Sequence, residues 1–138
     1  MFTFIGLLQF FSLQTFAATS LQMSSFKRHH FLVLVYSAHC KFCQRFIPIV
    51  KNFEIKNRWP GVAFTADTAS PLWPDVERLN SRLKYAWFGN HVQVPALFLY
   101  SDDGTISLIS LGYLNQASLE QRLKVFITRV IKREAKSA

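Results

Sequence analysis

The chain has 138 residues, enough for one domain with one core, and it is 50% hydrophobic with 14 Phe and 3 Trp, which excludes a disordered chain. Two Cys are too few for a scaffold that disulfides hold together. The formal charge of +8 is spread along the chain without interleaved aromatic residues for base stacking, so we interpret it as solvated surface and expect no nucleic-acid partner.

Residues 1–18 have the pattern of a signal peptide. The run from Phe2 to Phe16 is apolar and uncharged, and it is shorter than the roughly 20 residues that span a bilayer. Small residues follow, so we expect cleavage after Ala17 or Ala18. The basic residues that usually precede the apolar run are missing, which leaves a buried N-terminal helix as the alternative. The signal predicts a periplasmic protein, and its retention would associate the protein with a membrane.

The next part of the chain predicts strand, helix, strand and helix. Residues 31–37 (FLVLVYS) are apolar without alternation, which is typical of a strand buried on both faces. From Cys43 the apolar residues recur at helical spacing, and Pro48 is expected to kink this helix. A second strand is expected over residues 61–67, followed by the loop SPLWP and a helix that starts at Asp75. The apolar face of that helix would consist of Val76, Leu79 and Leu83.

The second half of the chain predicts a β-hairpin and a last helix. Residues 94–100 (VPALFLY) and 105–113 (TISLISLGY) are the two strands. In the second strand, Ile106, Leu108 and Ser110 alternate with Ser107, Ile109 and Leu111. The turn over residues 101–104 ends with Gly. Asn115 is placed to cap the last helix. The inner stripe of that helix is expected to consist of Leu119, Leu123, Phe126, Ile127, Val130 and Ile131.

The two cysteines, Cys40 and Cys43, lie where the first strand runs into the first helix. A helix N-terminus presents free N–H groups and the positive end of the helix dipole, which favour a thiolate at Cys40. Cys43 lies one turn further, on the buried side and within disulfide reach. We therefore predict a dithiol centre with Cys40 as the exposed nucleophile and Cys43 as the resolving thiol. The alternatives are a structural disulfide and a zinc site that would also use His29 and His30.

With this junction, the chain resembles the thioredoxin-fold superfamily over residues 26–133, with 134–138 as a tail. Pro48 lies where thioredoxins have a kinking proline, and Val94-Pro95 opens a core strand where the family has a cis proline that faces the cysteines. The resemblance implies an α/β thioredoxin fold, in which helices flank a central mixed sheet and a C-terminal β-hairpin is followed by a helix.

Within this superfamily, the chain is most similar to the TrbB-type periplasmic thiol-disulfide proteins of conjugative type IV secretion. The similarity lies in the segments HCKFCQRFIPIV and SPLWPDV and in a short chain with its own signal. It implies that the protein acts on other proteins of the cell envelope.

Departures from thioredoxin bear on the direction of the reaction. Leu34 stands where thioredoxins have a buried acid that accepts the proton of the resolving thiol, which argues against a reducing role. The pair between the cysteines is Lys41-Phe42, similar to isomerase-type Dsb proteins. Lys41 and His39 add positive charge beside Cys40, which favours its thiolate and a more oxidising disulfide.

The predicted site thus surrounds a catalytic cysteine pair with residues that shape it. The backbone at Val94 and Pro95 is expected to pair with substrate as an added strand. Phe42 is expected to contact substrate or to cover the apolar patch around the site, and His39 to adjust the local charge or to carry a proton.

We predict an exported thiol–disulfide oxidoreductase that oxidises or isomerises disulfides of envelope proteins, those of a conjugation apparatus among them. Its partners would be protein substrates with disulfides or thiols and a redox partner protein. We expect no cofactor and no metal. The alternatives are a redox-inactive thioredoxin-fold adaptor of a secretion system and a membrane-tethered reductase.

Overall fold

The computed structural model describes residues 20–137, and within this range five strands form one sheet in the order β3-β2-β1-β4-β5. The central strand β1 pairs in parallel with β2 and antiparallel with β4, so the sheet is mixed, as predicted. The strands are β1 (His30–Tyr36), β2 (Gly61–Thr65), β3 (Glu77–Arg78), β4 (Ala96–Ser101) and β5 (Ile106–Leu111).

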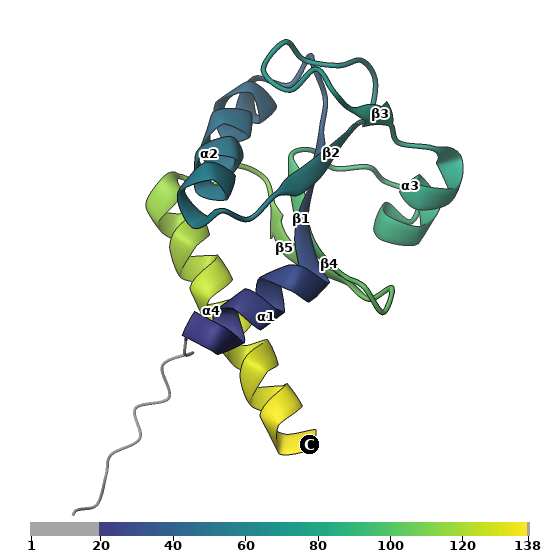
Figure 1. The fold of residues 1–138 in the computed structure, drawn as a ribbon. Coiled ribbons are helices and arrows are strands. Elements are labelled where there is room, and N and C mark those ends of the chain that lie inside the picture. Colours follow the sequence, from purple (N-terminus) through teal and green to yellow (C-terminus); the bar gives the residue numbers. More distant parts are fainter. Residues whose placement is uncertain (1–19, 138) are drawn as a thin grey trace, which may run out of the picture.

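Four helices flank this sheet in the described part of the chain: α1 (Ser20–His29), α2 (Lys41–Asn57), α3 (Ser81–Phe88) and α4 (Gln116–Ser137). α2 and α4 cover one face of the sheet, and α3 lies on the other (Figure 1). The hairpin of β4 and β5 is followed by α4, which confirms the predicted end of the fold.

The larger core lies between the sheet and the helices α2 and α4. The buried side of α2 carries apolar residues at helical spacing, and α4 contributes a matching stripe. Burial of each large apolar side chain contributes roughly 1.5–3 kcal/mol, so this interface anchors α2 firmly on the sheet. The residues at the centre of the interface are Phe46, Ile47, Val50, Phe53, Leu119, Leu123 and Ile127. The other predicted members of the α4 stripe are partly buried at its margin: Phe126, Val130 and Ile131.

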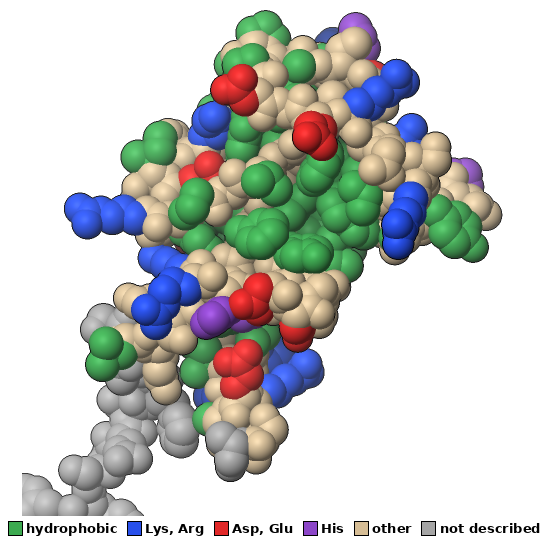
Figure 2. Space-filling model, turned by 45° about the vertical axis from the view of Figure 1, so that its right-hand side comes forward, with side chains coloured by type: hydrophobic (Ala, Val, Ile, Leu, Met, Phe, Trp, Pro, Cys, Tyr) green, Lys and Arg blue, Asp and Glu red, His purple; other side chains and the backbone are tan. Residues whose placement is uncertain are grey.

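The opposite face of the sheet is covered less completely. In the described residues, α3 packs there with eight residues, none of them fully buried. Figure 2, which brings the side of α3 forward, shows hydrophobic side chains gathered over one area of the surface. The partly buried apolar residues around this second cluster are Phe64, Leu83, Trp87, Phe88, Val94, Tyr100 and Ile106.

The helix predicted to start at Asp75 is wrong in position. The chain first forms β3, which pairs in parallel with β2, and the N–H of Leu79 donates to the carbonyl of Thr65 at 2.8 Å. α3 begins after Asn80, whose side-chain oxygen accepts a hydrogen bond from the Leu83 N–H at 2.9 Å. Hydrogen bonds to the open edge of β2 thus replace the first turn of the expected helix, and a better cap follows them.

Helix α1 is an element that the sequence analysis did not predict, as is β3. Phe26 of α1 is buried, stacks on His30 at 3.8 Å and meets Trp59 edge-on at 5.9 Å. The signal peptide predicted for residues 1–18 lies outside the described residues. None of the helices within residues 20–137 has the length and apolar character needed to cross a membrane.

The hairpin and the last cap follow the sequence prediction with one difference. The side-chain oxygen of Asn115 accepts from the Ser118 N–H at 2.8 Å, which confirms the predicted cap. A β-bulge shifts the pairing of β4 with β5, so that Ile109 and Ser110 are both buried. The regular alternation predicted for the second strand is therefore interrupted, because a bulge adds a residue to one strand.

Glu54 on α2 is packed tightly against the start of β2. A Cβ at Gly61 would clash with the Glu54 carboxylate and lie 2.9 Å from the Leu32 carbonyl oxygen. Glu54 Oε1 is buried and has no hydrogen-bond partner among the described residues. Burial raises the pKa of Glu54 to about 7, and the charge of Lys51 and the N–H of Gly61 offset part of this effect. The fold therefore holds a carboxylate that is costly to ionise.

We predict that Glu54→Gln removes a pH dependence of stability. Because the folded-state pKa of about 7 lies above the ordinary 4.5, the folded chain binds the proton more tightly than the unfolded chain. The free energy of unfolding should therefore fall between those two values as the pH rises. At about pH 8 the variant should be about 1–2 kcal/mol more stable than the wild type, less than the full pKa difference implies because solvent screens the partly accessible carboxylate, and the difference should be smaller at about pH 4. Urea denaturation at both pH values measures this.

Glu120→Gln is the matched control. Glu120 is an exposed carboxylate that pairs with Lys56 at 3.0 Å, and this hydrogen bond lowers its pKa. Loss of its charge should not stabilise the protein at high pH. An equal gain for both variants would show that net charge, rather than burial of Glu54, determines the pH dependence.

Candidate active site

The two cysteines lie at the carboxyl end of β1, where the chain enters α2. Cys40 is the N-cap residue of α2 and has an extended backbone. The N–H of Cys43 donates to Cys40 Sγ at 3.2 Å. The first N–H groups of a helix have no partner within the helix, and here the sulfur takes the place of the oxygen that a Ser or Asp cap would supply. Both cysteines are free thiols in the structure.

The two thiols differ strongly in their surroundings. Cys43, on the buried side of α2, is 0% exposed, whereas Cys40 is partly exposed. This agrees with the predicted pair of a buried and an accessible thiol. Burial raises the pKa of Cys43 to about 12, and the hydrogen bond to Cys40 and the charges of Cys40 and Asp67 act in the same direction. A hydrogen bond with the Ser37 backbone lowers it in part. Cys43 is therefore a protonated thiol at neutral pH.

The segment at Val94-Pro95 faces Cys40 from the start of β4. The peptide bond between them is cis, as the sequence analysis predicted. The carbonyl oxygen of Val94 lies 4.0 Å from Cys40 Sγ, and the Pro95 side chain is buried. The carbonyl of Pro95 accepts from the Gly112 N–H at 2.7 Å, and Gly112 has a φ of 91° that favours glycine. The hydrogen bond from Gly112, just after β5, thus holds the Val94-Pro95 segment in place beside Cys40.

The other predicted site residues surround Cys40 on the solvent side. His39, Lys41 and Phe42 are all exposed, and 59% of the Phe42 side chain is accessible. The backbone N–H of His39 donates to Ser37 Oγ at 3.2 Å. An exposed aromatic ring therefore lies two residues after the accessible thiol.

A carboxylate that sequence reasoning missed lies at the same edge of the sheet. Asp67 follows β2 and accepts hydrogen bonds from Ser37 Oγ at 2.5 Å and from the Ala38 N–H at 3.0 Å. The hydrogen bond from Ser37 is the main cause that holds the pKa of Asp67 well below its usual range. The carboxyl ends of neighbouring parallel strands meet at one edge, so the position of Asp67 after the second strand was a usable signal.

Further polar contacts hold the loop after β2 against the start of α2. Ser70 Oγ donates to Gln44 Oε1 and Gln44 Nε2 donates to the Ala38 carbonyl, both at 2.9 Å. The buried hydroxyl of Tyr36 donates to the Trp73 carbonyl at 2.7 Å and accepts from the Ser70 N–H at 2.9 Å. The loop and the cysteine junction therefore form one hydrogen-bonded unit.

The histidines considered as zinc ligands have other partners. His29 Nδ1 lies 2.5 Å from Asp102 Oδ2, and His30 Nδ1 lies 2.8 Å from the Phe26 carbonyl oxygen. In residues 20–137, no group of three or more His, Cys, Asp or Glu side chains is placed to hold a metal ion.

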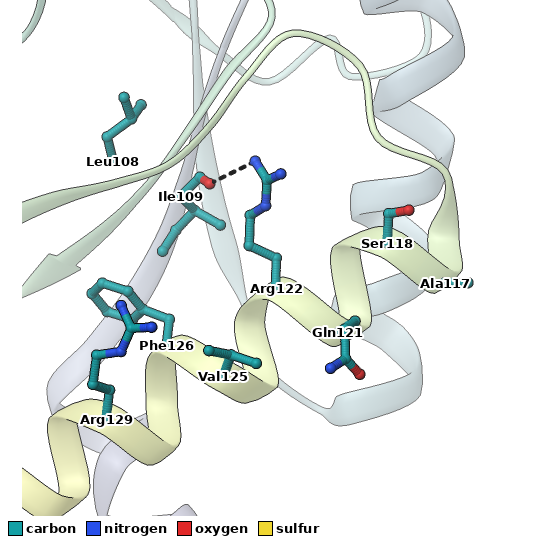
Figure 3. A pocket seen from close by; sticks show the side chains of 9 residues that line it. All are labelled: Leu108, Ile109, Ala117, Ser118, Gln121, Arg122, Val125, Phe126 and Arg129. Carbon is teal, nitrogen blue, oxygen red and sulfur yellow. Dashed lines mark hydrogen bonds between the residues drawn. The ribbon is translucent and has the colours of Figure 1, made fainter.

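A groove of about 810 Å³ lies between β5 and α4 (Figure 3). Leu108, Val125 and Phe126 give it apolar walls, and Arg122 Nη1 donates to the Ile109 carbonyl at 3.4 Å. None of the residues of the cysteine site lines this groove.

The central strand runs into a Cys-x-x-Cys helix, and a cis proline opens the neighbouring strand; on a mixed sheet these features define a thioredoxin-fold protein. The chain belongs to the TraF family, described as F plasmid transfer operon protein, whose family model matches residues 14–124. This confirms the predicted resemblance to thioredoxin-fold proteins of conjugative transfer.

Solved structures match this chain at low sequence identity, and the first of them shows the same fold. A thiol:disulfide interchange protein of the thioredoxin family from Chlorobium tepidum TLS has a TM-score of 0.54 and 18% identity, and the match covers 75% of this chain and 83% of that one. DsbF from MTB has a TM-score of 0.48 and 14% identity, with 72% and 81% covered. StoA from Bacillus subtilis has a TM-score of 0.48 and 14% identity, with 69% and 82% covered. Among curated proteins, none matches this chain.

We predict that an alkylating reagent modifies Cys40 and spares Cys43 in the folded, reduced protein. Cys43 is buried and its pKa is raised to about 12, so between about pH 6 and pH 10 it should react only after unfolding. Peptide mass spectrometry after timed treatment with iodoacetamide measures both sites. Cys40→Ser is the control, because burial should still protect Cys43 when its hydrogen-bond partner is replaced. Equal rates at the two cysteines would contradict the assignment of an accessible and a sheltered thiol.

Proposed function

We propose that the protein is an exported thiol–disulfide oxidoreductase that oxidises and isomerises disulfides of other envelope proteins, including components of a conjugative transfer apparatus. The observation that carries this proposal is the asymmetric pair: the partly exposed Cys40 caps α2, and the buried Cys43 N–H lies 3.2 Å from its sulfur. Cys40 can react with a protein substrate, and Cys43 lies close enough to form a disulfide with Cys40 afterwards.

In the oxidising direction, a substrate thiolate attacks Cys40 Sγ of the Cys40–Cys43 disulfide. The bond between the two cysteines breaks, a mixed disulfide forms, and the released Cys43 thiolate takes up a proton because of its raised pKa. A second substrate thiolate then attacks the substrate sulfur of the mixed disulfide and releases the Cys40 thiolate. The substrate loses two electrons and the protein gains them, so a redox partner with its own disulfide must reoxidise the pair.

The protonated state of Cys43 supports isomerisation as well as oxidation. When the Cys40 thiolate attacks a substrate disulfide, Cys43 must lose its proton before it can resolve the mixed disulfide. Burial, the main cause of the raised Cys43 pKa, persists when Cys40 is in a mixed disulfide, so this step is slow at neutral pH. The mixed disulfide then persists long enough for another substrate thiol to attack it, which rearranges the substrate without net oxidation.

The surroundings of Cys40 support an extended polypeptide as substrate. The Val94 carbonyl lies beside Cys40 Sγ, and backbone groups at this position can pair with a substrate segment as an added strand. The exposed ring of Phe42 offers an apolar contact. Lys41, His39 and the net charge of +8 favour acidic residues near the substrate cysteine.

The proposed periplasmic location rests on two observations. Residues 1–18 have the small-residue end and the apolar run of a signal peptide. The matching family is described by its place in a plasmid transfer operon, which agrees with work on envelope proteins of that apparatus.

We predict that Cys43→Ala traps mixed disulfides with envelope proteins and that Cys40→Ala does not. The first variant keeps the nucleophile and lacks the resolving thiol, so its covalent complexes should accumulate. Cells are acid-quenched and alkylated, and complexes are detected as bands that disappear on reduction. Equal trapping by both variants would contradict the assigned roles, and trapping by neither would favour the redox-inactive adaptor.

We predict a reduction potential between the roughly −270 mV of thioredoxin and the roughly −120 mV of DsbA. The positive charge of Lys41 beside Cys40 and the apolar Leu34 in place of a proton-accepting acid both favour a more oxidising disulfide. Equilibration with glutathione, followed by acid trapping and mass spectrometry, measures the oxidised fraction. A potential at or below that of thioredoxin would indicate an exported reductase.

A further inference from the structure

Asp67 binds the turn that leads into the dithiol. Its carboxylate accepts hydrogen bonds from Ser37 Oγ at 2.5 Å and from the Ala38 N–H at 3.0 Å, both in the turn between β1 and Cys40. Thr65 Oγ1 at 3.1 Å and the Thr68 N–H at 2.6 Å complete its contacts. These donors are all neutral, so the negative charge of Asp67 is stabilised by them but not cancelled.

This carboxylate is suited to act as a permanent anion rather than as a base. A group that accepts several hydrogen bonds in its ionised form releases its proton at a lower pH and takes it up with difficulty. The Ser37 hydroxyl and the surrounding donors lower the pKa of Asp67 in this way. Asp67 is thus no substitute for the proton-accepting acid that Leu34 replaces, although its charge reaches Cys43.

We propose that Asp67 is a positioning residue of the dithiol site, which anchors the turn before Cys40 and places a negative charge close to the cysteine pair. The inference rests on the proposed dithiol function and adds a residue that adjusts it. An anion close to the pair repels a further negative charge there, so it makes a reduced form that carries a thiolate less favourable and the disulfide a weaker oxidant.

The other charged and titratable groups around the pair come from few places. Cys43 is affected by Cys40 on α2 and by Asp67 on the loop after β2. From β4, the neutral Val94 carbonyl faces Cys40. His39 and Lys41 flank Cys40 in the sequence and are exposed, and the positive charge of Lys41 acts in the opposite sense to Asp67. Asp67 therefore offsets part of the effect of Lys41.

The test compares the equilibrium of four proteins with glutathione: the wild type, Asp67→Asn, Asp67→Glu and Ser37→Ala. Asp67→Asn removes the charge and keeps the shape, and it should lower the equilibrium constant for disulfide formation at least about threefold, which corresponds to a rise of about 14 mV in potential. Ser37→Ala keeps the anion and removes one of its hydrogen bonds, so its constant should stay within about 1.5-fold of the wild type. Asp67→Glu keeps the charge and should restore most of the wild-type value.

The outcomes separate charge from structure. Equal shifts in Asp67→Asn and Ser37→Ala would mean that Asp67 acts only by holding the turn, and no shift in Asp67→Asn would mean that its charge is irrelevant; either result overturns the proposal. Thermal unfolding of each variant reports whether it is folded. The reversible equilibrium of the wild type tests the proposed function, whereas the difference between variants tests Asp67.

A measurement on the wild type does not depend on the folding of any variant. Carbon-13 NMR of the Asp67 carboxyl should show no proton uptake down to about pH 3, below the usual range of Asp. Its signal should also shift when the cysteine pair titrates, because the charges interact. The proposal would be overturned if the Asp67 carboxyl binds a proton at about pH 4 or above, or if its signal does not shift when the cysteine pair titrates.

Discussion

The first N–H groups of α2 have no hydrogen-bond acceptors within the helix. The geometry of the cysteine site depends on the acceptor that replaces them. Cys40 Sγ accepts one of these bonds from the Cys43 N–H at 3.2 Å, which holds the sulfur at the N-terminus of the helix. One turn of helix then places Cys43 in the core. Because the apolar side of α2 is packed against the sheet along its length, the helix N-terminus that the sulfur caps is fixed in position.

The site is assembled from segments that are distant in the sequence and meet at one edge of the sheet. The cysteine junction follows β1, Asp67 follows its parallel neighbour β2, and the cis proline precedes its antiparallel neighbour β4. A hydrogen bond joins Ser37 of the cysteine junction to Asp67, and another joins Pro95 to Gly112 after β5. The positive charge of Lys41 lies on the exposed side of Cys40, and the negative charge of Asp67 lies at the turn before it. The charge around the thiols therefore depends on segments from different parts of the fold.

The sequence was informative wherever a local pattern determined the structure. The buried strand β1, the apolar stripe of α4, the cap at Asn115 and the cysteine junction all depend on residues close together in the chain, and they were predicted. The helix expected at Asp75 was displaced because the edge of β2 offered backbone partners, a tertiary effect that helical spacing cannot reveal. The bulge at Ile109 likewise depends on the pairing strand. Asp67 was missed because its role depends on Ser37 and Ala38, which the parallel pairing of β1 with β2 brings beside it.

Both ends of the described chain lie on the same side of the molecule. α1 joins the beginning of β1 and packs against α4, whereas Cys40 lies beyond the other end of β1 (Figure 1). β1 has seven residues at roughly 3.3 Å each, so about 20 Å of strand separates the reactive sulfur from the α1 junction. A linker, a fusion partner or a solid support attached at either end of this region would therefore leave the cysteine edge open to a large folded protein.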